Sequence, residues 1–173
     1  MATWTIDQEH SIIGFKVKHL MVSTVRGAFA EFAGSVETAD DTFENAKAVL
    51  TVQTNSVDTR SAGRDAHLRS GDFFEVEKFP TMNFISTSFM KKGESYEVVG
   101  DLTLHGVTKS VTLAATSGGI GVGFDGKRVA GFDVAGTIKR SDFGLVWNTV
   151  LEAGTIVVGD DVLLDMHIEA KEA

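Results

Sequence analysis

The sequence contains no cysteine, one proline and fewer basic than acidic residues. The absence of cysteine excludes disulfide bonds, thiolate metal sites and cysteine nucleophiles. The 16 Lys and Arg residues are outnumbered by 24 Asp and Glu residues, which gives a formal charge of -8, and the basic residues form no run. Because nucleic-acid binding depends on a basic stripe, this composition argues against a nucleic-acid partner.

A long apolar segment and a leader are also missing. No stretch approaches the roughly 18 apolar residues of a membrane-spanning helix. The first ten residues, MATWTIDQEH, have neither the basic nor the apolar part of a secretory signal peptide. We therefore expect a cytoplasmic location, unless a leader has already been removed.

Short alternating runs of β-branched and aromatic residues, separated by many of the 18 glycines, predict an all-β protein. The length of 173 residues suits one domain, which we assign to residues 1–173. The runs predict eight strands: Ser11 to Lys18, Gly27 to Glu37, Ala46 to Thr54, Thr81 to Phe89, Ser95 to Leu104, Lys109 to Thr116, Val129 to Lys139, and Asp161 to Lys171.

Alternation within these runs indicates how the strands are arranged. Ile13, Phe15 and Val17 alternate with charged residues, so one face of the sheet is packed and the other faces water. We predict an eight-stranded antiparallel up-and-down β-barrel. Phe29 and Phe32 break the alternation by one position, which indicates a bulge that bends the strand.

One short helix is predicted at residues 59–70, with Asp58 as N-cap and Gly71 as C-cap. In an up-and-down barrel successive loops alternate between the two rims. One rim then carries the turns near Asp40, near Gly93 and at 117–128. The other carries the loop Val22 to Arg26, the helical insert, the turn after Leu104 and the loop Ser141 to Asp160, so we expect the helix to cover this rim.

The helix-covered rim collects most of the positively charged candidates. These are His19, Arg26, Arg60, Arg64, His67, Arg69, His105, Lys109 and Arg140. His19 and Arg140 continue the inward parity of their strands, so both are predicted to point into the barrel, where an arginine suits an anionic or polar head group. An alternative stays open, in which Arg64 and Arg140 pair with carboxylates and only fasten the rim loops to the barrel. The candidate partners are Asp65, Asp72 and Asp142.

The familiar catalytic and cofactor motifs are absent or out of context. Gly121, Gly123 and Gly126 match G-x-G-x-x-G, but an alternating strand pattern follows instead of a helix, which favours a hairpin loop. No histidine pair has zinc-site spacing and no G-x-S-x-G elbow occurs, so we assign no metal ligand and no catalytic residue. A metal site formed by three histidines of the helix-covered rim, His19, His67 and His105, remains the alternative.

Five segments carry a resemblance to a known family. They are HSIIGFKVKH, VRGAFAEFAG, SVDTRSAGRDAHLRSGDFFEVEKFP, GDLTLHGVTKSV and RSDFG. With these segments in order along essentially its whole length, the chain resembles the YceI-like family of polyisoprenoid-binding barrels. The resemblance implies a lipocalin-like barrel, often a homodimer, that holds an extended isoprenoid lipid such as a prenyl quinone or prenyl phosphate. Some members of that family begin with a secretory leader; because the first residues of this sequence do not have that pattern, we do not expect periplasmic transport.

The resulting hypothesis is binding, storage or transfer of an isoprenoid lipid, with no cofactor besides that ligand. At about 0.8 kcal/mol per buried CH₂, each five-carbon unit contributes about 3 kcal/mol before ordering costs. The predicted pore wall consists of Phe15, Val17, Leu50, Val52, Phe84, Leu102, Val111, Phe132, Val134, Leu164 and Met166. The predicted head-group residues at the rim are His19, Arg64, His67, Arg69 and Arg140.

Two other hypotheses compete with lipid binding. The first is an enzyme that acts on the lipid head group with His19, His67 or His105 as acid or base. The second is an interaction or stress-linked module whose barrel holds no ligand and is filled by its own side chains. Small residues on the strands argue against a solid barrel, because they are expected to leave room inside. They are Gly14, Ala28, Ala30, Gly34, Ala46, Ala48, Gly100 and Gly136.

Overall fold

The computed structural model describes residues 1–149 and 156–173. Its strands are β1 (Ala2–Ile6), β2 (Ile12–His19), β3 (Ser23–Phe29), β4 (Phe32–Thr38), β5 (Lys47–Gln53), β6 (Val57–Asp58), β7 (Thr81–Lys92), β8 (Ser95–Leu104), β9 (Val107–Val122), β10 (Arg128–Lys139) and β11 (Val158–Glu172). One α-helix, α1 (Ala62–Arg69), and two 3-10 turns, η1 (Thr54–Ser56) and η2 (Arg140–Phe143), complete the described elements. Each of the eight predicted runs coincides with a strand position.

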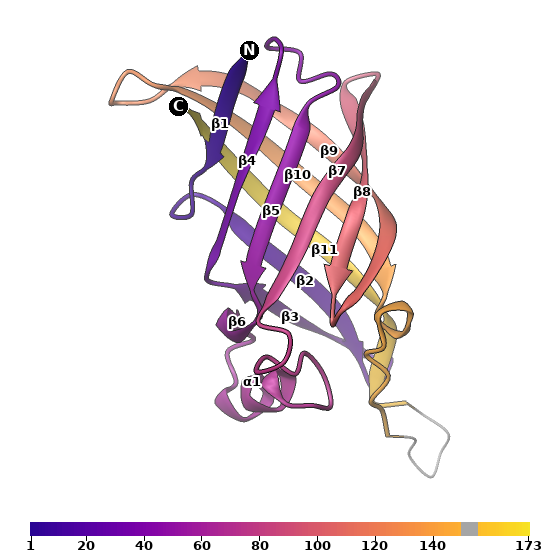
Figure 1. The fold of residues 1–173 in the computed structure, drawn as a ribbon. Helices are drawn as coiled ribbons and strands as arrows, with labels where there is room; N and C mark the ends of the chain where they lie inside the picture. Colours follow the sequence, from indigo (N-terminus) through magenta and orange to yellow (C-terminus); the bar gives the residue numbers. More distant parts are fainter. Residues whose placement is uncertain (150–155) are drawn as a thin grey trace.

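The sheet closes into a barrel of eight strand positions (Figure 1). β11 pairs with β2 from Val158 to His167 and with β1 through its last residues, so β1 and β2 share one position. β3 and β4 share the next position in the same way, because β3 pairs with β2 and β4 pairs with β1. β5, β7, β8, β9 and β10 complete the ring, and every pairing is antiparallel. The predicted eight-stranded antiparallel barrel is confirmed.

The loops divide between the two ends as predicted (Figure 1). The predicted loop Val22 to Arg26 is wrong in its bounds, because β3 begins at Ser23 and the chain turns at Leu20–Val22 instead. The end with α1, the β2–β3 turn, the β8–β9 turn and the segment after β10 is called the mouth end here. The end with both termini and the β4–β5, β7–β8 and β9–β10 connections is called the closed end. Part of the predicted loop Ser141 to Asp160 falls at residues 150–155, which lie outside the described residues.

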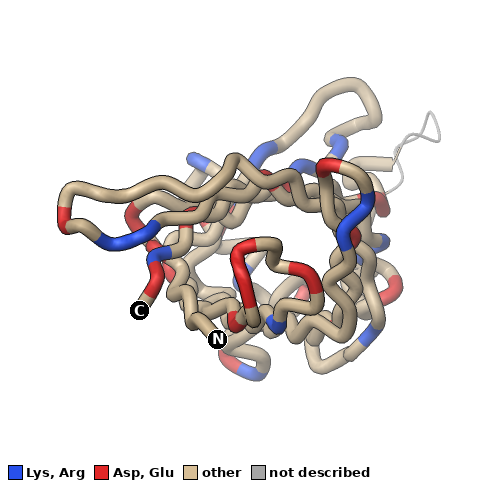
Figure 2. Tube along the Cα trace, turned by 90° about the horizontal axis from the view of Figure 1, so that it is seen from above, with Lys and Arg blue, Asp and Glu red and all other residues tan. Residues whose placement is uncertain are grey.

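Two strand irregularities differ from the sequence prediction. The predicted loop 117–128 is shorter, because β9 continues to Val122 and β10 begins at Arg128, and this hairpin projects from the closed end (Figure 2). The predicted bulge is a break between β3 and β4: Phe29 ends one strand, Phe32 begins the next, and both are buried. Inside the break, the N–H of Ala30 donates to a carbonyl of the β5–β6 connection.

Five aromatic side chains fill the interior of the closed end. This aromatic plug consists of Trp4, Phe43, Phe89, Tyr96 and Phe132. The Phe43 ring centroid lies 5.3 Å from that of Trp4 and 5.0 Å from that of Phe132. Phe43 belongs to the β4–β5 loop, and the view along the barrel from this end shows a loop with acidic residues lying across the ring (Figure 2). The barrel is therefore not an open tube.

The strand glycines do not leave empty space in the way we expected from the sequence. A Cβ at Gly100 would overlap the ring of Phe84, and a Cβ at Gly136 would overlap the side chain of Leu113. At Gly34, a Cβ would lie 2.7 Å from Cδ1 of Ile6. The expectation that these glycines make room for a ligand is wrong, because neighbouring side chains fill the room.

The helix is shorter than predicted and has different caps. Ser61 is the N-cap, and its hydroxyl accepts from the N–H of Arg64 at 3.4 Å. Asp58, the predicted N-cap, instead accepts from the N–H of Arg60 at 2.8 Å. Ser70, not Gly71, follows the last turn as the C-cap. Among the described residues, no helix has both the length and the apolar character needed to cross a bilayer.

Candidate ligand cavity

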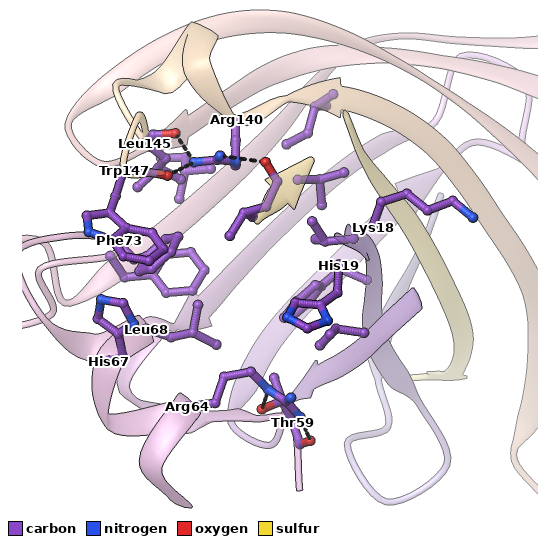
Figure 3. Close-up of a pocket in the computed structure, with 18 of the residues that line it drawn as sticks. Lys18, His19, Thr59, Arg64, His67, Leu68, Phe73, Arg140, Leu145 and Trp147 are labelled. Carbon is purple, nitrogen blue, oxygen red and sulfur yellow. Dashed lines mark hydrogen bonds between the residues drawn. The ribbon is translucent and has the colours of Figure 1, made fainter. Parts of the chain in front are cut away.

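A cavity of about 270 Å³ lies inside the mouth end of the barrel (Figure 3). Its lining is mainly aliphatic and aromatic, and its polar side chains are few. The lining consists of Phe15, Val17, Lys18, His19, Val25, Phe29, Thr59, Arg64, His67, Leu68, Phe73, Phe74, Met82, Leu104, Ile138, Arg140, Leu145, Trp147, Val157, Val158, Val162 and Leu164. The exposed residues Lys18, His19 and Arg64 mark its mouth.

Three predicted wall residues, Phe15, Val17 and Leu164, line this cavity. The other eight belong to the packed interior. They are Leu50, Val52, Phe84, Leu102, Val111, Phe132, Val134 and Met166. Their inward direction agrees with the predicted parity, but the space in front of them is occupied by other side chains.

Arg140 is held at the cavity edge as a latch between two chain segments. Its Nη1 donates to the carbonyl oxygens of Leu145 at 2.7 Å and Trp147 at 2.9 Å. Its Nε donates to the carbonyl of Gly159 at 2.8 Å, and Nη2 donates to that of Val158 at 3.2 Å. Four of its five N–H donors are thus used by the main chain. The predicted inward orientation is confirmed, and one Nη2 hydrogen is left for any other acceptor.

The charge of Arg140 has no directly paired carboxylate among the described residues. Its side chain is only 6% exposed. Burial lowers the pKa of the Arg140 guanidinium, while the negative charge of Asp160 acts in the opposite direction. The carboxylate of Asp160 itself accepts from the N–H and hydroxyl of Ser141. The alternative in which Arg140 pairs with Asp142 is wrong as to the partner, although the guanidinium does fasten the loop.

Arg64 has a similar but more exposed arrangement. Its Nε donates to Oγ1 of Thr59 at 2.7 Å, and its Nη2 donates to the carbonyl of Thr59 at 2.6 Å (Figure 3). The buried carboxylate of Asp65 accepts from the N–H and hydroxyl of the same Thr59. Thr59 therefore separates the two charges, and the Nη1 group of Arg64 remains at the cavity mouth.

An aromatic corner closes one side of the cavity. The His67 ring centroid lies 4.6 Å from that of Trp147 and 5.0 Å from that of Phe73, both in edge-to-face geometry. Nε2 of His67 lies 2.8 Å from Oδ2 of Asp72. Sequence alternation could not assign Trp147 and Phe73 to the site, because they lie in irregular segments where parity gives no direction. The family-like segment SVDTRSAGRDAHLRSGDFFEVEKFP contains Phe73, and this position beside the predicted helix is the one signal that could have assigned it to the rim.

The remaining rim candidates are distributed differently. His19 lines the cavity mouth, as its parity predicts. Arg69 is not part of the lining, because its guanidinium donates to the carbonyls of Asn55 and Val57. His105 also lies outside the lining, with Nδ1 3.2 Å from the carbonyl oxygen of Phe143. Of the three proposed acid–base histidines, the cavity therefore brings together only His19 and His67.

Only one group in the described part of the chain clusters metal-ligating atoms. Asp7, His10 and Glu169 bring one such atom each within 4.8 Å of one another, near the β1–β2 break. Lys171 Nζ lies 2.8 Å from Oδ2 of Asp7, where a cation ligated by that oxygen would have to sit. The hydrogen bond from Lys171, followed by that from His10, holds the pKa of Asp7 well below its usual range. Asp7 in turn raises the pKa of His10. This cluster fits an ion-paired network better than a metal centre.

A closed β-barrel with an apolar cavity at one rim is the architecture of lipocalin-like barrels. The family model described as "YceI-like domain" matches residues 4–170. The chain belongs to the YceI-like domain family.

Sequence and structure comparisons agree with this assignment. A UPF0312 protein of Staphylococcus aureus (strain MSSA476) is 38% identical over 170 residues, which cover 98% of this chain and 97% of the relative. The Campylobacter jejuni YCEI protein superposes with a TM-score of 0.75 at 34% identity and covers 90% of each chain.

More distant solved structures share the fold. Burkholderia cenocepacia BcnA superposes with a TM-score of 0.82 at 24% identity, over 95% of this chain and 98% of that one. A polyisoprenoid binding domain from Saccharophagus degradans, implicated in plant cell wall breakdown, gives a TM-score of 0.69 at 18% identity, over 98% of both chains.

Proposed function

We propose that this protein binds the chain of a long isoprenoid lipid, of the prenyl quinone or prenyl phosphate type, and stores or transfers it without catalysis. The observation that carries the proposal is the apolar cavity at the mouth end, whose polar groups lie at its edge. An apolar chain gains affinity from burial alone, so the cavity needs no polar anchor in its interior. The Saccharophagus degradans neighbour is a polyisoprenoid binding domain, which supports the same ligand class.

The mouth favours a polar or anionic head group over a second apolar group. His19 and the Nη1 group of Arg64, which has no hydrogen-bond partner among the described residues, offer donors there, whereas most donors of Arg140 are already satisfied. A head group therefore interacts with His19 and Arg64 before Arg140. Binding of a prenyl phosphate should then weaken with added salt more than binding of the matching prenol.

Solvent extraction of the purified protein, followed by lipid mass spectrometry, tests the proposal directly. A co-purifying isoprenoid, or uptake of a prenol or prenyl quinone by the emptied protein, supports it. A protein that is repeatedly empty and takes up neither compound would overturn it.

A matched pair of substitutions on β11 tests whether the cavity is the binding site. Leu164 lines the cavity, whereas its neighbour Leu163 points outward and is 47% exposed. Leu164→Trp should fill the cavity and abolish uptake, while Leu163→Trp should bind as the unmodified protein does. Equal uptake by the two variants would place the ligand elsewhere, provided that circular dichroism shows both to be folded.

Binding without turnover is also part of the proposal. His19 and His67 lie at the cavity edge, so they are the groups to test for head-group chemistry. Incubation with prenyl phosphates and prenyl quinones should leave each ligand chemically unchanged. Conversion that is lost in His19→Ala or His67→Ala would replace the binding proposal with an enzymatic one.

A homodimer and a cytoplasmic location complete the proposal. The first is supported by the resemblance to a family that is often dimeric, and the second by the acidic, cysteine-free composition. Light scattering coupled to size exclusion and fractionation of the source cells are the respective measurements. A monomer, or recovery outside the cytoplasm, would contradict these two statements without affecting the cavity.

A further inference from the structure

The β2–β3 turn combines a strained backbone with exposed apolar side chains. Leu20 and Met21 have φ of 53° and 59°, and the N–H of Val22 closes the turn by donating to the carbonyl of His19 at 3.2 Å. Tight turns with positive φ favour Gly, Asn or Asp, and bulky residues are strained there. Met21 is nevertheless 54% exposed and Val22 83% exposed. The two side chains add little to the core, so their position at the tip needs another explanation.

Positive charges lie beside this apolar tip and along the strand that follows it. Lys18, Arg26, Arg60 and Arg64 are exposed, and none of them forms an ion pair with a carboxylate in the parts of the chain that the structure describes. Two carboxylates lie near these charges. The exposed Asp58 accepts from the main-chain N–H of Arg60. Asp165 pairs with Lys16 at 3.1 Å and also interacts with the charge of Arg26. This side of the mouth is therefore basic, although the whole chain carries a formal charge of -8.

The tip is continuous with the cavity mouth. Lys18 and His19 immediately precede the turn and also line the cavity (Figure 3). Leu20 is tied to the other side of the mouth, because its N–H donates to the carbonyl of Val157 at 2.9 Å. Any surface that receives the tip therefore meets the entrance to the cavity.

We propose that the turn Leu20–Val22 inserts into the interface of an anionic lipid bilayer, while the basic side chains of Lys18, Arg26 and Arg60 contact the lipid phosphates. Apolar tips beside basic residues are the combination that binds anionic membrane surfaces. A protein partner suits this feature less well, because a stable protein interface buries about 800 Å² on each side and the apolar tip has only two strongly exposed residues. Docking brings the cavity mouth to the source of its ligand, and that consequence rests on the proposed function.

Vesicle co-sedimentation of the full chain tests the docking. The protein should bind vesicles of phosphatidylcholine that contain phosphatidylglycerol and should not bind pure phosphatidylcholine, and added salt should weaken binding. Met21→Asn/Val22→Ser should lower the vesicle partition coefficient about tenfold or more. The reason is that a buried Met or Val side chain contributes at least about 1.4 kcal/mol, and this free energy corresponds to a tenfold change. Asn suits the left-handed turn, so the variant should remain folded. Arg26→Gln/Arg60→Gln should lower binding about fivefold for each charge removed.

The closed end supplies a matched control. Val122 and Phe124 are the strongly exposed apolar residues of the β9–β10 hairpin, at the opposite end of the barrel. Val122→Ser/Phe124→Ser should bind vesicles as the unmodified protein does. If this variant loses binding, if the turn variant keeps it, or if neutral and anionic vesicles bind equally, the proposal is overturned. A dimer that dissociates in the turn variant would show that a second copy covers the tip, and would overturn it too.

Ligand uptake separates this proposal from the proposed function. Met21→Asn/Val22→Ser should take up a prenol from detergent micelles as the unmodified protein does, but should take it up more slowly from anionic vesicles. Vesicle binding without any prenol uptake would reject the isoprenoid function and leave docking standing. Normal uptake by a protein that binds no vesicles would reject docking alone.

Discussion

Arg140→Met is expected to destabilise the protein strongly, because it removes the latch between the segment after β10 and the start of β11. Four donors of the guanidinium bind main-chain carbonyls. A hydrogen bond from a charged donor contributes about 1.5–3 kcal/mol, so the four set a ceiling of about 6–12 kcal/mol. Burying the guanidinium offsets several kcal/mol of that sum. We expect a net loss of about 3 kcal/mol in the free energy of unfolding, since the substitution leaves several main-chain carbonyls without their donor and each buried acceptor left unsatisfied costs about 1–3 kcal/mol.

Urea unfolding measures this loss, and a thermal midpoint about 6–12 °C lower should accompany it in a chain of this size. Tryptophan emission gives a local readout, because Trp147 should become more exposed to water while Trp4 stays in the aromatic plug. Lys139→Met is the matched control, since Lys139 is 60% exposed and, within residues 1–149 and 156–173, forms an ion pair only with Asp161. It should change the urea midpoint little.

Arg140→Lys should recover only part of the lost stability. A lysine presents its donors from one nitrogen and cannot reach carbonyls on both segments as the guanidinium does. If Arg140→Met unfolds within about 0.5 kcal/mol of the unmodified protein, the latch reasoning is refuted, because a change that small is typical of surface substitutions. Arg140 would then be free to act mainly on a ligand.

Three other substitutions test the packing and the charge network. Gly27→Ala should cost about 1–3 kcal/mol in urea unfolding, because the added Cβ overlaps the ring of Phe15, and Phe15→Leu in the same chain should recover part of it. Phe43→Ala should cost about 3–5 kcal/mol by removing the centre of the aromatic plug, whereas the exposed Phe124→Ala should cost little. For Asp7→Asn, the stability lost relative to the unmodified protein should depend on pH. The lowered pKa of Asp7 means that its carboxylate stabilises the fold above about pH 4, and that this stabilisation fades as pH falls toward the folded value. The raised pKa of His10 means that its protonated form stabilises the fold below about pH 6.5, and that this part fades as pH rises through the folded value. Urea midpoints should therefore differ most near pH 5, and a difference that keeps growing toward pH 3 would contradict the assignment.

The strand positions were predictable because each long strand has one wet and one packed face. Phe15 and Val17 alternate with charged residues over enough positions to establish the period. β1 and β6 were missed because they have five and two residues, which is too short for alternation to appear. The end of β9 was missed because its glycines provide no side-chain pattern, although the backbone continues to pair with β10.

The extent of the cavity was not predictable from alternation. Phe15 and Phe132 have the same inward parity, but Phe15 borders the cavity and Phe132 is packed against Phe43. The difference arises at the closed end, where a loop residue fills the interior. Alternation also predicted the inward direction of Arg140 correctly. It did not predict the partners of Arg140, because every residue has a main-chain carbonyl and such acceptors cannot be recognised in a sequence.

The aromatic plug closes one end of the barrel, so the depth available to a ligand chain is limited. The affinity of the protein for a series of ligands should therefore depend on their chain length. If the cavity holds a lipid as proposed, a short apolar chain can be enclosed completely, whereas a longer one must either leave its end outside or displace side chains of the packed interior, such as Met166, that lie beyond the cavity. Affinity should rise with each added five-carbon unit only until the chain reaches the packed interior. The chain length at which affinity stops rising should therefore measure the depth of the cavity.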